Sequence, residues 1–179
     1  MRLTLTSIAA ILSFCAISNL ALGQSVEPQL EAPEPDITTF DAGESYTTTL
    51  DTKNDIDIRI LDGGVLVNGV GYKMYNNGGG TLNNSGVLEN RDTLTNQVGA
   101  TLTSSGRLTN AAGGELTNGG TLNSTVGSQL SNRGTLTNNG TLTNDGTLIS
   151  AGTVVNSLSL TNSGVLENRD TLTNQVGAT

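Results

Sequence analysis

A short unit of apolar and polar residues recurs along the second half of the chain at almost constant spacing. An aliphatic residue occurs fifteen times from Leu82 to Leu172. The spacing is six residues, except that eight residues separate Leu94, Leu108 and Leu122 from the next unit. A six-residue period does not follow the 3.6-residue turn of an α-helix, and the units are rich in Thr and Gly. The repeat therefore excludes helices and favours short strands.

The side chains of each unit divide between two faces. In a strand, residues two positions apart point to the same side. Each aliphatic residue is followed two positions later by Asn in twelve units and by Ser in three. We expect Leu to stack inward from coil to coil, and the Asn amides to form a hydrogen-bonded ladder at the corners, as in cross-β structures. The residues with these structural roles are Leu82, Leu88, Leu94, Leu102, Leu136, Leu142, Asn90, Asn96, Asn138 and Asn144.

Glycine and the longer units are expected to form the corners. Gly at the fourth position after Leu, as in Gly86 and Gly140, is expected to adopt corner conformations that other residues avoid. In the eight-residue units, Val98, Ala112 and Val126 take this fourth position. We expect these three side chains to point inward and to widen the corner.

The spacing of the units also predicts the architecture. Grouping them by threes gives coils of about 18–20 residues, a period typical of solenoids, and predicts an all-β fold, a three-sided β-solenoid or β-helix. Grouping by twos gives shorter coils of alternating length and a flatter, two-sided solenoid, which the spacing leaves open. Residues 84–101 recur unchanged at 162–179, an offset of four coils in the grouping by threes. Because the chain ends with this second copy, we expect a fragment or truncated product with an incomplete C-terminal end.

The chain divides into four segments. Residues 1–23 contain Arg2, an apolar stretch and final small residues, the pattern of a secretory signal peptide. Residues 24–38 contain all three prolines and several carboxylates, which indicates an acidic linker. In residues 39–80 apolar and polar residues alternate, as in IDIRI at 56–60. This segment also holds the only aromatic residues after the expected cleavage site. We expect them to form a strand-rich N-terminal cap on a repeat solenoid of residues 81–179.

The composition limits the chemistry of the chain. The net charge is −8, so nucleic acid is not expected as a partner. Histidine is absent, and the single cysteine, Cys15, lies in the expected signal peptide. We therefore expect no enzyme activity, metal or cofactor. The tetrapeptide at residues 89–92 is expected to be a solvated, salt-bridged corner, and no membrane-spanning segment is expected in the mature chain.

The run GTLTNNGTLTNDGTLI at residues 134–149, together with the secretory start, resembles passenger repeats of bacterial autotransporters and filamentous haemagglutinin-like adhesins. The resemblance covers roughly residues 78–179. It implies a β-helical stalk that is exported to the outer surface, the medium or the periplasm. It also implies an adhesive role towards an unknown surface ligand or a component of a host or neighbouring cell. Exposed sheet edges at the solenoid ends favour end-to-end self-association.

Outward threonines suggest a second hypothesis. Thr-x-Thr pairs would align into ranks on a flat face, which resembles ice-binding solenoids and would suit ice or polysaccharide. Thr also has a high β propensity and solubilises an exposed sheet. In the three-sided grouping the pairs fall on two faces, where Arg107, Glu115 and Gln129 are expected to interrupt them. The candidate surface-binding residues are Thr93, Thr95, Thr101, Thr103, Thr135, Thr137, Thr141, Thr143, Thr171 and Thr173. A disordered low-complexity region is the third interpretation.

Overall fold

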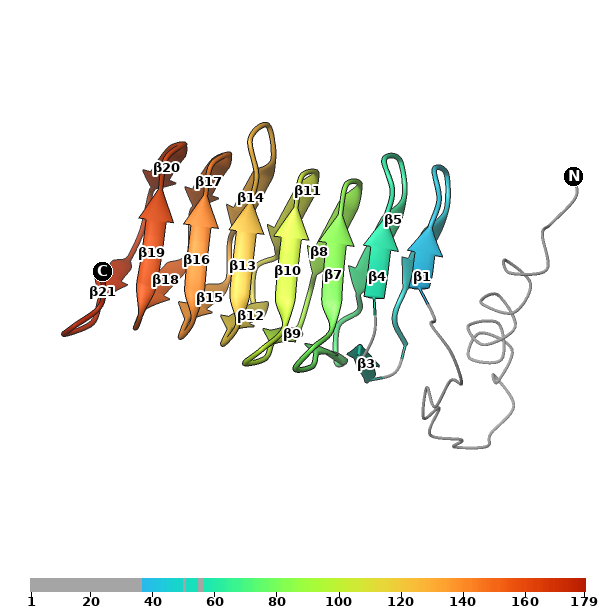
Figure 1. The fold of residues 1–179 in the computed structure, drawn as a ribbon, viewed down its shortest axis with the longest axis horizontal. Helices are drawn as coiled ribbons and strands as arrows, with labels where there is room; N and C mark the ends of the chain where they lie inside the picture. Colours follow the sequence, from blue (N-terminus) through green and yellow to red (C-terminus); the bar gives the residue numbers. More distant parts are fainter. Residues whose placement is uncertain (1–36, 50, 55–56) are drawn as a thin grey trace, which may run out of the picture.

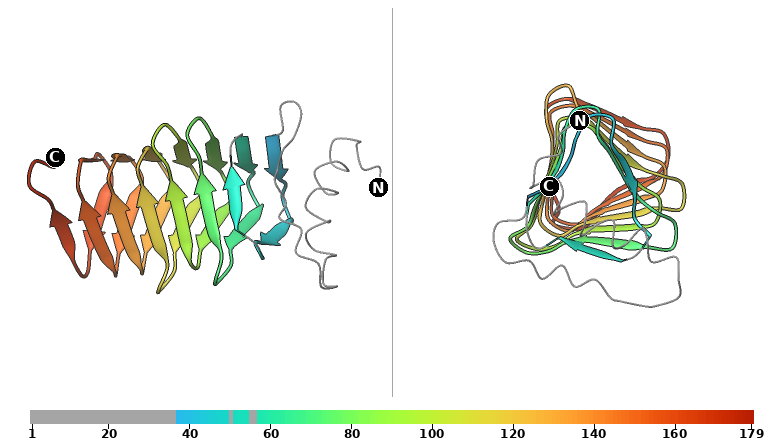
Figure 2. Two further views of the ribbon diagram at one scale, coloured as in Figure 1. Left: turned by 90° about the horizontal axis from the view of Figure 1, so that it is seen from below. Right: turned by 90° about the vertical axis from the view of Figure 1, so that its right-hand side faces the viewer.

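The computed structural model describes residues 37–49, 51–54 and 57–179, and the regular structure in these ranges consists of β-strands. The strands wind into a solenoid (Figure 1), and the view along its axis shows a triangular cross-section (Figure 2, right). The three-sided arrangement predicted from the spacing is therefore confirmed, and the two-sided alternative is wrong. The expected signal peptide and nearly all of the expected linker lie outside the described residues.

Each coil contributes one strand to each of three parallel sheets, and each sheet has seven strands. Sheet A, in the foreground of Figure 1, contains β1 (Ile37–Phe40), β4 (Asp57–Ile60), β7 (Thr81–Asn84), β10 (Thr101–Ser104), β13 (Thr121–Ser124), β16 (Thr141–Asn144) and β19 (Ser159–Asn162). Sheet B contains β2 (Ser45–Thr47), β5 (Val65–Asn68), β8 (Val87–Asn90), β11 (Arg107–Asn110), β14 (Gln129–Asn132), β17 (Thr147–Ser150) and β20 (Val165–Asn168). Sheet C contains β3 (Thr52–Asn54), β6 (Lys73–Asn76), β9 (Thr93–Asn96), β12 (Glu115–Asn118), β15 (Thr135–Asn138), β18 (Thr153–Asn156) and β21 (Leu172–Asn174).

Successive strands of each sheet pair in register, with Leu beside Leu. In sheet A, Leu82 pairs with Leu102, and Leu102 pairs with Leu122, so these two coils are equal in length. The later pairing of Leu142 with Leu160 marks a slightly shorter coil, which lacks an eight-residue unit. These pairings are the ones expected from grouping the units by threes.

The inward aliphatic residues form one continuous core. Those from Leu82 to Leu148 are at most 1% exposed. They belong to one cluster that also includes Phe40, Ile58, Ile60, Leu66, Met74 and Val154. Burial of a Leu side chain stabilises a protein by roughly 1.5–3 kcal/mol. Since each coil packs against its neighbours, the stability of a solenoid is approximately a sum over adjacent coils.

Residues 39–80 continue the same architecture as the repeats. Their strands pair with β7, β8 and β9 in the same three sheets, so no architectural boundary lies at residue 81. Ile58 and Ile60 are buried and Arg59 is exposed, as the alternation predicts, whereas Ile56 lies outside the described residues. The rings of Phe40 and Tyr46 pack with their centroids 4.9 Å apart in the first coil. A capping role for this segment stays a prediction.

The repeated glycines have a different role from the predicted one. Neither Gly120 nor Gly140, both at the fourth position after Leu, has a positive φ. A Cβ atom on Gly140 would collide with the carbonyl oxygen of Gly120, and one on Gly120 would collide with that of Ala100. The prediction that these glycines supply unusual backbone conformations is therefore wrong. They are needed because the backbones of adjacent coils approach too closely for a side chain.

Within the eight-residue units, the turn glycines Gly99, Gly113 and Gly127 do have a positive φ, as does Gly63 in the N-terminal coils. The three side chains expected to point inward are all exposed at the surface: Val98, Ala112 and Val126. That expectation is wrong because the two extra residues form a turn. In the turn at residues 97–100, the N–H of Ala100 donates to the carbonyl of Gln97 at 3.0 Å. Gly99 has a φ of 82° at the third position, as in a type II turn. Ala100, which follows it, is the residue that points inward, at 1% exposure.

Replacing Gly140 by Ala is expected to destabilise the solenoid by about 1–3 kcal/mol, because the added methyl group overpacks the contact with the preceding coil. Urea unfolding followed by far-UV circular dichroism measures the change. Asn139→Ala is the matched control, because Asn139 is the exposed neighbour, and it should change stability by less than about 0.5 kcal/mol. Equal unfolding midpoints for the two variants would refute the close-approach explanation.

Candidate functional site

The candidate surface residues project outward because Leu and Asn fill the interior. In β9 and β15, both with the sequence TLTN, Leu and Asn are buried while the Thr residues are half-buried or exposed. The outer face of each sheet is therefore made of the residues that flank Leu. These positions can vary without disturbing the core.

The structure distributes the candidate threonines over two faces, as the three-sided grouping predicts. Sheet A holds Thr101, Thr103, Thr141 and Thr143. Sheet C holds Thr93, Thr95, Thr135, Thr137 and Thr173, and Thr171 directly precedes β21. The pairs are thus not assembled into one site. Binding by any of them stays a prediction.

The prediction that Arg107, Glu115 and Gln129 interrupt these ranks of threonines is only partly correct. Glu115 pairs in register with Thr93 on one side and with Thr135 on the other, so it does interrupt the threonines of sheet C. Arg107 and Gln129 pair with each other in sheet B. The expectation that these two residues interrupt the threonine ranks is therefore wrong, and no charged residue occurs in the strands of sheet A from β7 to β19.

Two columns of hydrogen-bonding side chains run along the outer face of sheet A. The first column is Thr81, Thr101, Thr121, Thr141 and Ser159. The second column is Asn83, Thr103, Asn123, Thr143 and Thr161. A search for Thr-x-Thr pairs within single units misses Thr81, Asn83, Thr121 and Asn123, because each column joins every third unit. Writing the sequence one coil per line would have found them.

The inward asparagines form ladders inside the corners, as predicted. At the corner between sheets C and A, each Nδ2 donates to the Oδ1 of the next coil at 2.7–2.8 Å. This ladder consists of Asn54, Asn76, Asn96, Asn118, Asn138, Asn156 and Asn174. The same amides also donate to main-chain carbonyls, as Asn118 does to Thr141 at 2.8 Å. The ladder begins before the repeats and is unbroken through seven coils.

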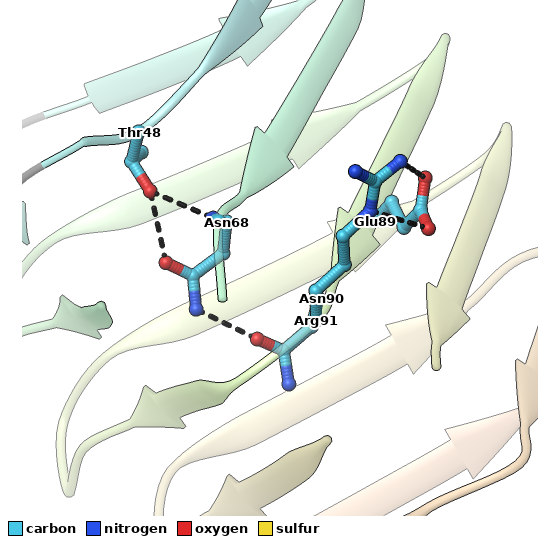
Figure 3. A network of polar contacts seen from close by, with 6 residues as sticks. Thr48, Asn68, Glu89, Asn90 and Arg91 are labelled. Carbon is cyan, nitrogen blue, oxygen red and sulfur yellow. Dashed lines mark hydrogen bonds and ion pairs between the residues drawn. The ribbon is translucent and has the colours of Figure 1, made fainter. Parts of the chain in front are cut away.

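The other two corners contain shorter ladders. At the end of sheet B, Thr48 starts a ladder that passes through Asn68 and Asn90 (Figure 3) and reaches Ser150. At the end of sheet A, the Ser124 hydroxyl bonds to the Ser128 hydroxyl at 2.7 Å instead of to the next coil. The buried Oδ1 of Asn144 consequently has no hydrogen-bond partner among the described residues. Serine thus interrupts the ladder where it replaces Asn.

The charged tetrapeptide at residues 89–92 is a salt-bridged corner, as predicted. Arg91 Nε lies 2.9 Å from Glu89 Oε1, and Arg169 pairs with Glu167 at 2.7 Å in the duplicated segment (Figure 3 shows the first pair). The hydrogen bond from Arg91 lowers the pKa of Glu89, so the pair contributes stability above the usual Glu pKa and loses it as the pH falls. Because both pairs are largely exposed, their contribution is small.

The described residues contain no group of three or more His, Cys, Asp or Glu side chains arranged to hold a metal ion. In the same part of the chain, no helix is long and apolar enough to cross a membrane.

Replacing Asn118 by Ala is expected to destabilise the solenoid by about 2–4 kcal/mol, because Asn96 Nδ2 loses one acceptor and the buried Oδ1 of Asn138 loses its donor. The control is Asn123→Ala, which removes an outward amide from β13, the next strand along the chain. Urea unfolding of both variants measures the difference. A similar loss in both variants would show that the ladder is not a special source of stability.

The double variant Ser124→Asn/Ser128→Ala should stabilise the chain by about 1 kcal/mol, because the new amide can donate to the unpaired Oδ1 of Asn144. It reproduces the corner at Asn96 and Ala100, where Asn fits beside an eight-residue turn. Thermal and urea unfolding test this expectation. Ser128→Ala alone is the control, and a double variant no more stable than this control would contradict the interpretation of the interrupted ladder.

Comparison with known proteins adds a family match to this geometry. A family model described as haemagglutinin repeat matches residues 75–112 and 103–175. The two matches together extend from β6 to the residue after β21 and cover more than half of the chain. No curated protein and no solved structure matches the chain.

Proposed function

Because this chain belongs to the haemagglutinin-repeat family, we propose that it is a secreted or surface-displayed adhesin-like protein whose solenoid is both a stalk and a binding surface. The observation that carries the proposal is the family match, which covers the coils from β6 to β21. The resemblance of residues 134–149 to adhesin passenger repeats supports it independently of the fold.

The construction of the solenoid suits a stalk. Adjacent parallel strands lie about 4.8 Å apart, so each added coil lengthens the molecule by about that distance. The unbroken ladder at the corner between sheets C and A links every coil to the next. Such a rod holds its two ends apart, and its outward residues remain available to a partner.

The distribution of polar groups supports a non-catalytic role. Glu89 and Glu167 are each paired with an arginine, and Glu115 and Asp145 are exposed on separate strands or corners. Hydrolytic or transfer chemistry requires several convergent groups in a concave site. The carboxylates of the repeats lie on the outer surface instead.

Export and the partner belong to the same proposal. Residues 1–23 act as a secretory signal peptide, and the mature chain reaches the outer surface, the medium or the periplasm. Its partner is a surface ligand of a host or neighbouring cell, and the exposed sheet edges at the solenoid ends allow end-to-end association of copies. The outward residues of the three sheets provide the contact surface.

Beads coated with the purified chain are expected to bind and agglutinate cells, because adhesive contacts repeated over many copies raise avidity. Erythrocytes, epithelial cells and bacteria form the test panel, and flow cytometry counts the attached beads. The control is Leu116→Asp, which places a charge in the core and should unfold the surface. Binding no greater than that of this control on all three cell types would refute the adhesive role.

A further inference from the structure

The outer face of sheet A between β7 and β19, called here the hydroxyl face, differs in composition from the other two faces. Its ten outward positions are all Thr, Asn or Ser. Equivalent positions hold Arg107 and Ile149 on sheet B and Glu115 on sheet C. Since the fold accepts charged and aliphatic residues at these places, folding alone does not require the uniform composition of the hydroxyl face.

The hydroxyl face is a regular lattice. Its strands lie side by side in a row (Figure 1) and pair in register. Neighbouring strands are about 4.8 Å apart, and outward residues two positions apart along a strand are about 6.6–6.8 Å apart. Thr side chains have few rotamers because they are branched at Cβ. The face is therefore ordered before any partner arrives, which lowers the entropy lost on binding.

The chemistry of this lattice selects an uncharged, extended and repeating partner. Within β7 to β19 this array carries no charge to attract an ion, although its two columns continue into Asp57 and Arg59 of β4. An outward sheet face also offers no concave pocket for a small molecule. It can match a surface whose own hydrogen-bonding atoms repeat at comparable intervals in two directions. The faces of ice crystals have this property, because their oxygen atoms repeat at similar spacings and both donate and accept hydrogen bonds.

We propose that the hydroxyl face binds ice. This inference goes beyond the proposed adhesive function, because ice is not a ligand on a cell. The two columns would place hydroxyl and amide groups against the oxygen lattice, while the Thr methyl groups fill the spaces between them. Because the columns run along five successive coils, each coil adds the same small contact and the binding strength grows with the number of ranks.

The alternative partner, a polysaccharide, fits this face less well. Sugar rings commonly bind proteins by stacking on aromatic side chains, which combine a large apolar area with a polar group. The hydroxyl face contains no aromatic residue, and the described aromatic residues belong to the first two coils. Tyr75, for example, lies in β6 of sheet C.

The test measures the partition of the purified chain into slowly growing ice, with light microscopy of the crystal shape. The unchanged protein should concentrate in the ice. Thr143→Lys places a long charged side chain in an inner rank of the hydroxyl face and should lower the ice-bound fraction about tenfold, which corresponds to about 1.4 kcal/mol. Thr117→Lys is the matched control, because Thr117 follows Leu in the same LTN context with the same burial in sheet C and is not one of the candidate surface-binding residues. Circular dichroism verifies the fold of both variants.

Two results would overturn the inference: exclusion of the unchanged protein from ice to the same degree as serum albumin, or an equal loss of ice binding in both lysine variants. Binding to insoluble cellulose that Thr143→Lys abolishes, without partition into ice, would also overturn it and assign the face to polysaccharide. The cell-binding assay separates the two proposals. If the chain binds cells but not ice, the adhesive function stands and the ice-binding proposal is wrong.

Discussion

The whole arrangement depends on the buried amide at the corner of each coil. Asn96, Asn118 and Asn138 are at most 1% exposed, and a buried primary amide must satisfy two N–H donors and a carbonyl oxygen. The neighbouring coils supply the ladder partners only when an amide or a hydroxyl group lies directly in line. Packing of Leu is non-directional and would allow a coil to slide, whereas the ladder does not. Aligned coils in turn place the outward residues in straight columns.

The parts of the fold that follow from local periodicity could be predicted. The spacing of Leu82, Leu102 and Leu122 gives the coil length, and the Asn two positions after most of the aliphatic residues predicts the ladder. The role of Gly140 could not be found this way, because the atom that excludes a side chain belongs to Gly120 in the preceding coil. The turn at Val98 could have been predicted, since Gly at the next position is the usual signal of a type II turn.

The candidate surface was harder to derive than the core. Single units show threonine pairs, but neighbours on a solenoid face are one coil apart in the sequence. Arg107 follows Thr103 closely along the chain, yet it lies on sheet B, beside Gln129 of the next coil. Nothing within one unit shows that Asn83 and Asn123 complete the column of Thr103. The composition of a face can therefore be derived only after the number of sides of the solenoid is known.

The duplicated segment has a consequence for how such a molecule can change its length. Residues 84–101 and 162–179 are identical, and both begin at the last residue of a sheet A strand, β7 and β19. The offset between the two copies is thus four complete coils. Genetic exchange between the two identical stretches would insert or remove four coils, about 19 Å of rod at the usual strand spacing, and leave every remaining column in phase. The length of the rod can therefore change in evolution by whole coils, and the sequence before and after each change can fold as a solenoid.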